Sequence, residues 1–164
     1  MKSFTEFLHE QESTGVYVSI DTDLEQMVEF KEGIFTKRAH CTLMYAEDQS
    51  FNEFKLKINS IVDYYAGKPI EGTCESIEAF DDKEGTCALV LKIDSEMIRE
   101  IHGKLKALGL IHSYDDFQAH VTYAYRINKS DVDRLQLMLQ QKFANKKFTF
   151  MNFTVEPLDK NWVT

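Results

Sequence analysis

The sequence has few of the residues that interrupt or cross-link small domains. Its 164 residues include two prolines, seven glycines and three cysteines. The cysteines, Cys41, Cys74 and Cys87, are odd in number and form no Cys-x-x-Cys pair, so we expect neither a disulfide framework nor a structural zinc site. Because no Gly/Ser-rich or Pro-rich linker is present, we expect one globular domain over residues 1–164.

Long apolar runs and an excess of positive charge are also missing. No apolar stretch approaches the ~18 to 20 residues that cross a bilayer, and the acidic segment MKSFTEFLHEQEST resembles no targeting peptide. We therefore expect a cytoplasmic protein without a membrane partner. The 27 acidic and 19 basic residues give a net charge of −8, which disfavours polymeric DNA or RNA as a partner. A small anionic ligand is compatible with this charge, because a deep pocket can supply its own donors.

Hydrophobic periodicity predicts an α+β fold. Alternating apolar residues predict strands at 15–20, 39–45, 70–80, 86–93, 119–126 and 148–157. Apolar residues three and four apart predict helices at 3–11, 23–33, 50–67, 94–109 and 130–143. The expected N-caps are Ser50, Asp94 or Ser95, and Ser130, and the expected helix ends are Gly67 and Gly109. The segment DDKEG predicts a β-hairpin between the third and fourth strands.

One short pattern occurs twice. Ala-His-x-Thr-x-x-Tyr is found at 39–45 as AHCTLMY and at 119–125 as AHVTYAY, each time on a predicted strand. Residues i and i+2 lie on the same face of a strand, so His40 is expected beside Thr42 and His120 beside Thr122. The final tyrosines of the two copies, Tyr45 and Tyr125, are five positions from their histidines. This odd spacing predicts that they lie on the opposite face and pack in the core.

Two such strands side by side would place two imidazoles and two hydroxyls on one surface. This set suits a phosphodiester, with one histidine as general base, the other as general acid, and threonine hydroxyls donating to the phosphate oxygens. The pattern leaves open which histidine has which role. No metal or other cofactor is required, and although His112, Asp115 and Asp116 precede the second copy, zinc-ligand spacing is absent. Alternatively, His40 and His120 are half-buried structural residues of a sheet.

The paired motifs, HCTL at His40 and HVTY at His120, resemble those of the 2H phosphoesterase superfamily. The resemblance covers essentially the whole domain through its repeat. It implies a bilobal, pseudo-twofold α+β fold in which antiparallel sheets line a central groove, with helices outside. The superfamily includes RNA 2′,3′-cyclic phosphodiesterases, RNA-end processing enzymes and phage anti-CBASS nucleases that destroy cyclic oligonucleotide signals. The size, the acidic charge and the segment LHEQESTGVYVSI are most similar to the anti-CBASS group.

This resemblance implies a metal-independent phosphodiesterase that hydrolyses 3′–5′ bonds of cyclic di- or oligonucleotides. It would act in the cytoplasm of a phage-infected bacterium, as a monomer, and would evade CBASS immunity. The catalytic residues would be His40, Thr42, His120 and Thr122. Two alternatives remain: a 2′,3′-cyclic phosphodiesterase acting on RNA ends, and a non-catalytic protein that sequesters a cyclic nucleotide. The chain has no evident basic tract for an RNA strand, which disfavours the first of these.

A lid is expected at the carboxyl-terminal segment 157–164. The only tryptophan, Trp162, lies in this segment, where burial in a core would be difficult. In a lid, Trp162 would stack on a base and Glu156 would hydrogen-bond a base edge. An acidic and an aromatic residue at this place are also what the anti-CBASS resemblance implies. The alternative is that Trp162 anchors the last strand.

Further substrate-binding residues are expected near the amino terminus and before the first motif. Tyr17 on the first strand, and Phe4 or Phe7 on the first helix, are expected to provide the second stacking surface. Lys37 and Arg38 directly precede the first motif, so one of them is expected to reach a ligand phosphate.

Overall fold

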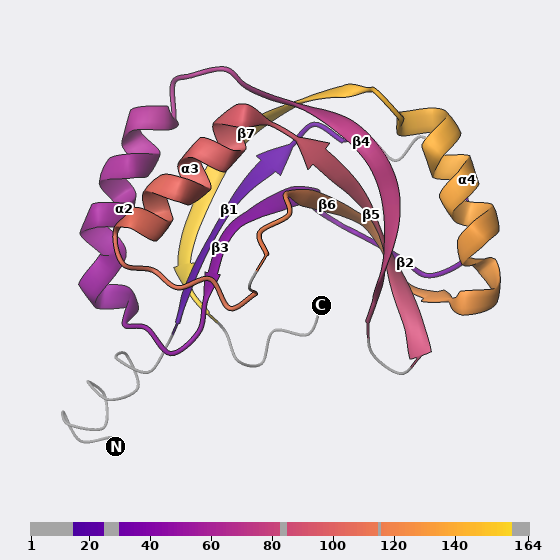
Figure 1. Cartoon of the computed structure of the whole chain (residues 1–164), viewed down its shortest axis with the longest axis horizontal. Helices are drawn as coiled ribbons and strands as arrows, with labels where there is room; N and C mark the ends of the chain where they lie inside the picture. Colours follow the sequence, from indigo (N-terminus) through magenta and orange to yellow (C-terminus); the bar gives the residue numbers. More distant parts are fainter. Residues whose placement is uncertain (1–14, 25–29, 83–84, 115, 159–164) are drawn as a thin grey trace.

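The chain forms an α+β structure in the computed structural model, which describes residues 15–24, 30–82, 85–114 and 116–158 (Figure 1). The strands of this part are β1 Val16–Thr22, β2 Ile34–Phe35, β3 His40–Ala46, β4 Ile70–Asp81, β5 Thr86–Asp94, β6 His120–Asn128 and β7 Lys147–Pro157. Its helices are α2 Phe51–Tyr65, α3 Glu96–Ala107 and α4 Val132–Phe143, the last preceded by the short 3₁₀ helix η2 Lys129–Asp131. None of these helices has the length and apolar character that crossing a bilayer requires.

The strands form one antiparallel sheet with the order β2-β6-β3-β1-β7-β4-β5. The predicted α+β class is therefore confirmed. The resemblance implies antiparallel sheets around a central groove; hydrogen bonds join all seven described strands into one sheet. An additional pairing between β5 and β6 closes this sheet on itself. Closure through β6 brings the two copies of the repeated pattern, on β3 and β6, into direct contact.

The predicted strands all lie within two residues of their expected bounds, because alternation is a local signal. Strand β2 was not predicted, since two residues are too short to show a period. The helices expected at 50–67, 94–109 and 130–143 are present as α2, α3 and α4. The helix expected at 3–11 lies outside the described residues. That expected at 23–33 is not found in its described portions, 23–24 and 30–33, where Phe30 instead packs against the rings of Phe35 and Tyr123.

Helix ends follow the expected capping chemistry with one exception. The hydroxyls of Ser50 and Ser95 each accept a hydrogen bond from a backbone N–H in the first turn of α2 and α3. Gly109 follows the end of α3 with φ of 104°, a conformation that favours glycine. The prediction of Ser130 as an N-cap is wrong, because η2 extends the helical turn toward the amino terminus and Asp131 is the N-cap of α4.

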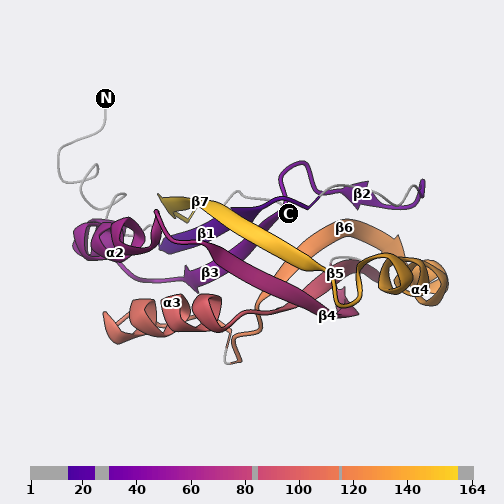
Figure 2. The same cartoon turned by 90° about the horizontal axis from the view of Figure 1, so that it is seen from above.

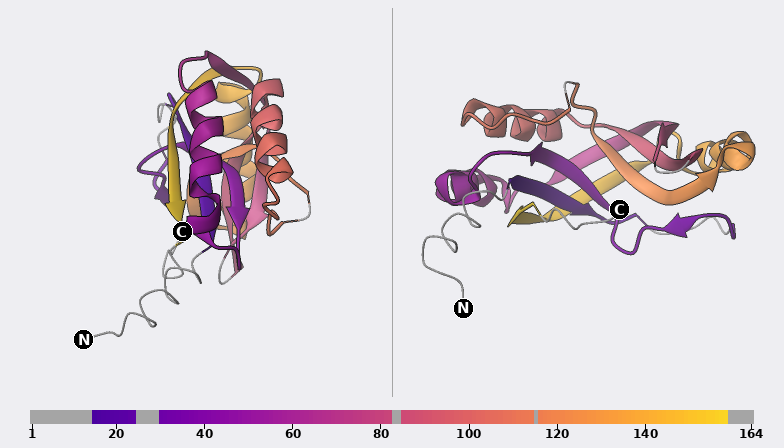
Figure 3. Two further views of the ribbon diagram at one scale, coloured as in Figure 1. Left: turned by 90° about the vertical axis from the view of Figure 1, so that its left-hand side faces the viewer. Right: turned by 90° about the horizontal axis from the view of Figure 1, so that it is seen from below.

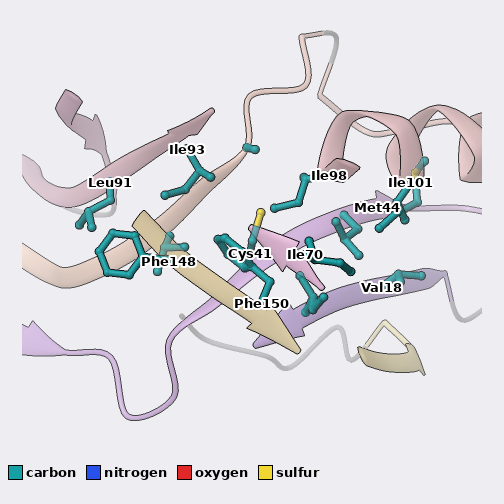
Figure 4. Close-up of a cluster of buried hydrophobic side chains, with 14 of the residues drawn as sticks. Val18, Cys41, Met44, Ile70, Leu91, Ile93, Ile98, Ile101, Phe148 and Phe150 are labelled. Carbon is teal, nitrogen blue, oxygen red and sulfur yellow. The ribbon is translucent and has the colours of Figure 1, made fainter. Parts of the chain in front are cut away.

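The hydrophobic core lies between the sheet and the helices. Helices α2 and α3 lie side by side at one end of the molecule and α4 lies at the other, as Figures 2 and 3 show. Figure 4 shows strand residues such as Cys41, Met44 and Phe150 packing with Ile98 and Ile101 of α3. The burial of these side chains is the main stabilising contribution. It also orients β3, since burying Cys41 directs its neighbours His40 and Thr42 to the other face.

Candidate active site

The two copies of the repeated pattern meet at their central residues. Cys41 of β3 pairs with Val121 of β6 in antiparallel orientation, and both side chains are buried. An antiparallel register sets the residue before Cys41 opposite the residue after Val121. His40 therefore lies across from Thr122, and Thr42 from His120. Residues opposed in this way have Cα atoms about 4.5–5.5 Å apart. The structure thus gathers two imidazoles and two hydroxyls on one face of the sheet.

Both imidazoles are held by the same backbone contact. Nδ1 of His40 lies 3.0 Å from the carbonyl oxygen of Arg38, and Nδ1 of His120 lies 2.8 Å from that of Gln118. A carbonyl oxygen only accepts hydrogen bonds, so each Nδ1 carries the proton and donates it. In both rings Nε2 is then the nitrogen that can accept a proton.

The surroundings of the two imidazoles differ. Phe80, from the end of β4, packs edge-on to the ring of His120 with centroids 5.3 Å apart. Burial lowers the pKa of the His120 imidazole below its ordinary value, and the nearby His40 lowers it further. The hydrogen bond to Gln118 and the charge of Glu78 act in the opposite direction but do not outweigh the burial. Near neutral pH, His120 is therefore biased toward its neutral, proton-accepting form.

The hydroxyl of Thr42 has a tyrosine partner. Tyr17 of β1 places its phenolic oxygen 3.1 Å from Oγ1 of Thr42, and either oxygen can donate. Burial raises the pKa of Tyr17, so that its hydroxyl stays protonated. Tyr17 is expected to stack on a base, but only 5% of its surface is exposed. Its contact with Thr42 and its edge-on packing against His40 are the more direct roles.

A β-bulge in each copy of the pattern overturns the expectation for the two tyrosines. In β3, Thr42 and Met44 pair with two consecutive residues of β1, so that Leu43 between them is an extra residue. In β6, Tyr123 is likewise an extra residue, because its two neighbours pair with consecutive residues of β5. One extra residue reverses the alternation of the strand. Tyr45 and Tyr125 therefore lie on the same face as the histidines and line the same cavity, instead of packing in the core. Both tyrosines lie five residues after a histidine, and this repeated spacing was the one sequence signal that could have indicated a role beside the histidines.

Two adjoining cavities open at this face. The aromatic cavity, of about 610 Å³, is lined by the four motif side chains together with Tyr17, Tyr45, Phe80, Tyr114, Phe117 and Tyr125. The cationic cavity, of about 540 Å³, contains Lys37, Arg38 and Arg126 in its wall. Both cavities share Tyr17, His40 and Tyr125, so His40 lies at their border, whereas His120 lines the aromatic cavity alone. Phe80 and Arg126 carry no local sequence pattern that could have identified them.

Several residues expected to bind substrate lie at the cationic cavity. Arg38 lines it, but its guanidinium already contacts Asp21 at 2.7 Å and the hydroxyl of Thr154 at 2.6 Å. Glu156 of β7 pairs in register with Tyr17 and is exposed at the same cavity. Of the expected lid, Pro157 ends β7 and the buried Leu158 is anchored by a hydrogen bond to Gly15. Trp162, Phe4 and Phe7 lie outside the described residues.

No group of three or more histidine, cysteine or carboxylate side chains that could hold a metal ion is found in the described part of the chain. Nδ1 of His112 accepts a hydrogen bond from the backbone N–H of Tyr45 at 3.1 Å. The carboxylate of Asp116 accepts one from the side chain of Gln118, also at 3.1 Å. His112 and Asp116 thus have protein partners, and Asp115 lies outside the described residues.

Comparison with known proteins identifies one family. Residues 14–164 match the family model described as "Anti-CBASS protein Acb1". The chain is 26% identical over 161 residues to the anti-CBASS protein Acb1 of Vibrio phage KVP40, covering 93% of each protein. It is 25% identical over 124 residues to that of Enterobacteria phage T4, covering 70% of this chain and 74% of the relative. The match to that of Salmonella phage S16 is 27% over 89 residues, covering 52% and 51%.

Proposed function

Because the chain belongs to the family of the anti-CBASS protein Acb1, we propose that it is a phosphodiesterase that hydrolyses cyclic oligonucleotide signals and so evades CBASS immunity. It would act inside a phage-infected bacterium. One observation carries the chemical part of the proposal: the two His-x-Thr motifs meet across the Cys41–Val121 pair and line one cavity together, with His40 at its border with a second cavity. The proposal includes the bilobal 2H phosphoesterase fold, with β1, β3 and β7 in one lobe and β4, β5 and β6 in the other.

In the proposed reaction, His120 is the general base and His40 the general acid. Nε2 of neutral His120 takes a proton from the nucleophile, which is a ribose 2′-hydroxyl of the substrate or a water molecule. The nucleophile's oxygen then bonds to phosphorus while the bond from phosphorus to the 5′-oxygen breaks. Protonated His40 gives its Nε2 proton to that leaving oxygen. The lowered pKa of His120 supports this assignment, since it favours the neutral form.

The two threonines stabilise the charge that develops on the phosphate. As the nucleophile adds, negative charge grows on the non-bridging oxygens, and the hydroxyls of Thr42 and Thr122 donate to them. The contact from Tyr17 supports this role for Thr42, because it fixes the orientation of that hydroxyl. Proton transfer and charge stabilisation are then both supplied by side chains. The mechanism requires no metal ion.

Cyclic oligonucleotides are the preferred substrates for two reasons. The matched family is described by its action against CBASS. A small ring also suits two adjoining cavities of about 540 and 610 Å³ on a chain whose net charge of −8 repels long nucleic acids. The alternatives are cleavage of 2′,3′-cyclic phosphates at RNA ends and sequestration of a cyclic nucleotide without cleavage.

One experiment separates the three functions. The purified full chain is incubated in EDTA with 3′,3′-cyclic dinucleotides and, separately, with an RNA oligonucleotide ending in a 2′,3′-cyclic phosphate, and products are identified by mass. The proposal predicts linear products from the cyclic dinucleotides, with the His120→Ala protein as the inactive control. Cleavage of the RNA end alone would favour the first alternative. Tight binding of a cyclic dinucleotide without any product would favour the second and overturn the enzymatic proposal.

A further inference from the structure

We propose that Arg126 binds the second, non-scissile phosphate of a cyclic dinucleotide in the cationic cavity. This inference rests on the proposed function, because it needs a ring with one phosphate at the histidine pair. It adds a subsite for the part of the substrate that does not react.

The two cavities differ in charge. Among the described residues, three carboxylates and no lysine or arginine line the aromatic cavity, whereas three cations and one carboxylate line the cationic cavity. These are Asp81, Asp82 and Asp116 in the first, and Lys37, Arg38, Arg126 and Glu156 in the second. The lining of the cationic cavity carries more positive than negative groups, although the whole chain has a net charge of −8. A phosphate next to the histidine pair is attracted to that side and repelled from the other.

A cyclic dinucleotide must place its second phosphate in one of these cavities. Its two phosphates lie on opposite sides of the ring, so a reacting phosphate at the border directs the other into one cavity or the other. The cationic cavity offers donors to a phosphate, and the aromatic cavity offers rings on which bases can stack. The charge difference therefore orients the whole substrate.

Arg126 is the cation that the backbone directs into this cavity. Tyr125 and Arg126 together lie opposite the single residue Ala88 of β5, which makes a second bulge in β6. Arg126 has φ of 61°, in the left-handed region that residues other than glycine rarely adopt. Consecutive residues of a regular strand point to opposite faces, yet Tyr125 and Arg126 both line the cationic cavity.

Asp82 holds this conformation in place. One oxygen of its carboxylate accepts a hydrogen bond from the backbone N–H of Arg126 at 2.9 Å, and the other accepts a hydrogen bond from the hydroxyl of Thr86. The guanidinium of Arg126 lies 4.0 Å from the carboxylate, which is longer than a hydrogen bond. A guanidinium carries five N–H donors in a planar fork, so it can interact with Asp82 and bind a phosphate at the same time. Arg38, whose guanidinium contacts Asp21 and Thr154, lines the same cavity.

The other copy of the pattern has no equivalent cation. Ala46 occupies the position after Tyr45 that Arg126 occupies after Tyr125, and its side chain is buried. The repeat is therefore symmetric through its histidines, threonines and tyrosines and becomes asymmetric at the next residue. A cyclic dinucleotide requires this asymmetry, because one phosphate reacts and only one further phosphate needs a site.

The test compares two ligands that share bases but differ in phosphate number. In a His120→Ala background, which slows turnover strongly, calorimetry measures the Kd of a 3′,3′-cyclic dinucleotide and of the linear dinucleoside monophosphate with the same bases. We expect Arg126→Gln to weaken binding of the two-phosphate ring by about 10- to 100-fold, as for the loss of charge-assisted hydrogen bonds. Binding of the one-phosphate ligand should change by less than about threefold. Arg126→Lys should recover part of the affinity, because it keeps a point charge.

Two further variants separate charge from folding. Arg126→Gly removes the same charge but suits the left-handed backbone, so it should melt no lower than the unmodified chain and lose the same affinity. Arg99→Gln is the matched control: it removes an exposed arginine of α3 that pairs with Asp94, away from both cavities, and should bind like the parent.

Each outcome has a defined meaning. Equal effects of Arg126→Gln on both ligands, or no effect on the ring, would overturn the second-phosphate site. If that site behaves as expected but the unmodified chain cleaves no cyclic dinucleotide, the proposed enzymatic function fails and the subsite stands. If neither ligand binds the His120→Ala chain or the unmodified chain, both proposals fail.

Discussion

The β3 and β6 copies of the repeated pattern hold their histidines in the same way but surround them differently. In both copies Nδ1 donates to a backbone carbonyl and a bulge returns a tyrosine to the histidine face. In β6, Phe80 covers the imidazole of His120 and its pKa is lowered. In β3, Tyr17 contacts Thr42. In the proposed mechanism the shared features leave Nε2 of each ring for proton transfer, and the differing features favour His120 as the base and His40 as the acid.

The largest expected effect comes from removing either imidazole. His40→Ala or His120→Ala should reduce kcat on a cyclic dinucleotide by about 10²- to 10⁴-fold, because each change removes one proton-transfer partner. Thermal unfolding should change little, since both side chains are only half-buried. Near-normal turnover by either variant would show that the two copies do not act as a pair.

The next largest effect concerns the carboxyl-terminal lid. If Trp162 stacks on a base, Trp162→Ala should weaken substrate binding by about 1–3 kcal/mol. Truncation after Leu158 should have the same effect, because it retains the buried anchor to Gly15. Titration calorimetry and thermal unfolding are measured on the same samples. A lowered melting temperature together with equal loss on a 2′,3′-cyclic mononucleotide would assign Trp162 to anchoring the last strand.

A smaller effect is expected from the partner of Thr42. Tyr17→Phe removes the hydroxyl that orients Thr42 and should lower kcat about fivefold, the equivalent of one hydrogen bond of about 1 kcal/mol. Tyr64→Phe is the control, since Tyr64 is exposed on α2 and lines neither cavity. An effect of the same size in both variants would remove the orienting role from Tyr17.

The dependence of the rate on pH tests the division of roles. The proposed mechanism requires neutral His120, so kcat/KM should fall as the pH drops through the pKa of His120 and its imidazole becomes protonated. Burial lowers this pKa, so the acid limb should lie at lower pH than for an ordinary histidine. Phe80→Ala admits water, raises the pKa and should move the acid limb to higher pH. A limb that stays in place would contradict His120 as the base.

The smallest expected effect is that of chelation. Because the proposed mechanism assigns proton transfer and charge stabilisation to side chains, EDTA should leave kcat unchanged. The measurement is turnover before and after dialysis against EDTA, with single divalent ions then added back. Loss of activity that one ion restores would make Asp115, Asp116 and His112 candidates for metal ligands.

Features with a local pattern could be predicted from the sequence. The strands that carry His40 and His120 show the alternation of apolar residues, and the repeat itself indicates that the two motifs are equivalent. The face on which Tyr45 and Tyr125 lie could not be predicted, because a bulge depends on how a strand pairs with its neighbours. The odd spacing from each histidine accordingly predicts the wrong face for both tyrosines.

Contacts between segments far apart in the sequence could likewise not be predicted from local sequence patterns. Phe80 reaches His120 only because β4 and β5 form a hairpin that pairs with β6. Arg126 lines the cationic cavity because its own backbone is left-handed, and Asp82 of the same hairpin accepts a hydrogen bond from its backbone N–H. Both contacts depend on the pairing of β5 with β6 that closes the sheet, and the periodicity of a single strand does not predict that pairing.

The most direct test of the account is the turnover of the double variant His40→Ala, His120→Ala on a cyclic dinucleotide. An acid and a base that act in one reaction step lose most of their benefit when either is removed, so the second substitution should add little. We expect the double variant to lie within about tenfold of the slower single variant. Losses that multiply, so that the double variant shows the product of the two single effects, would contradict a joint role for the two copies.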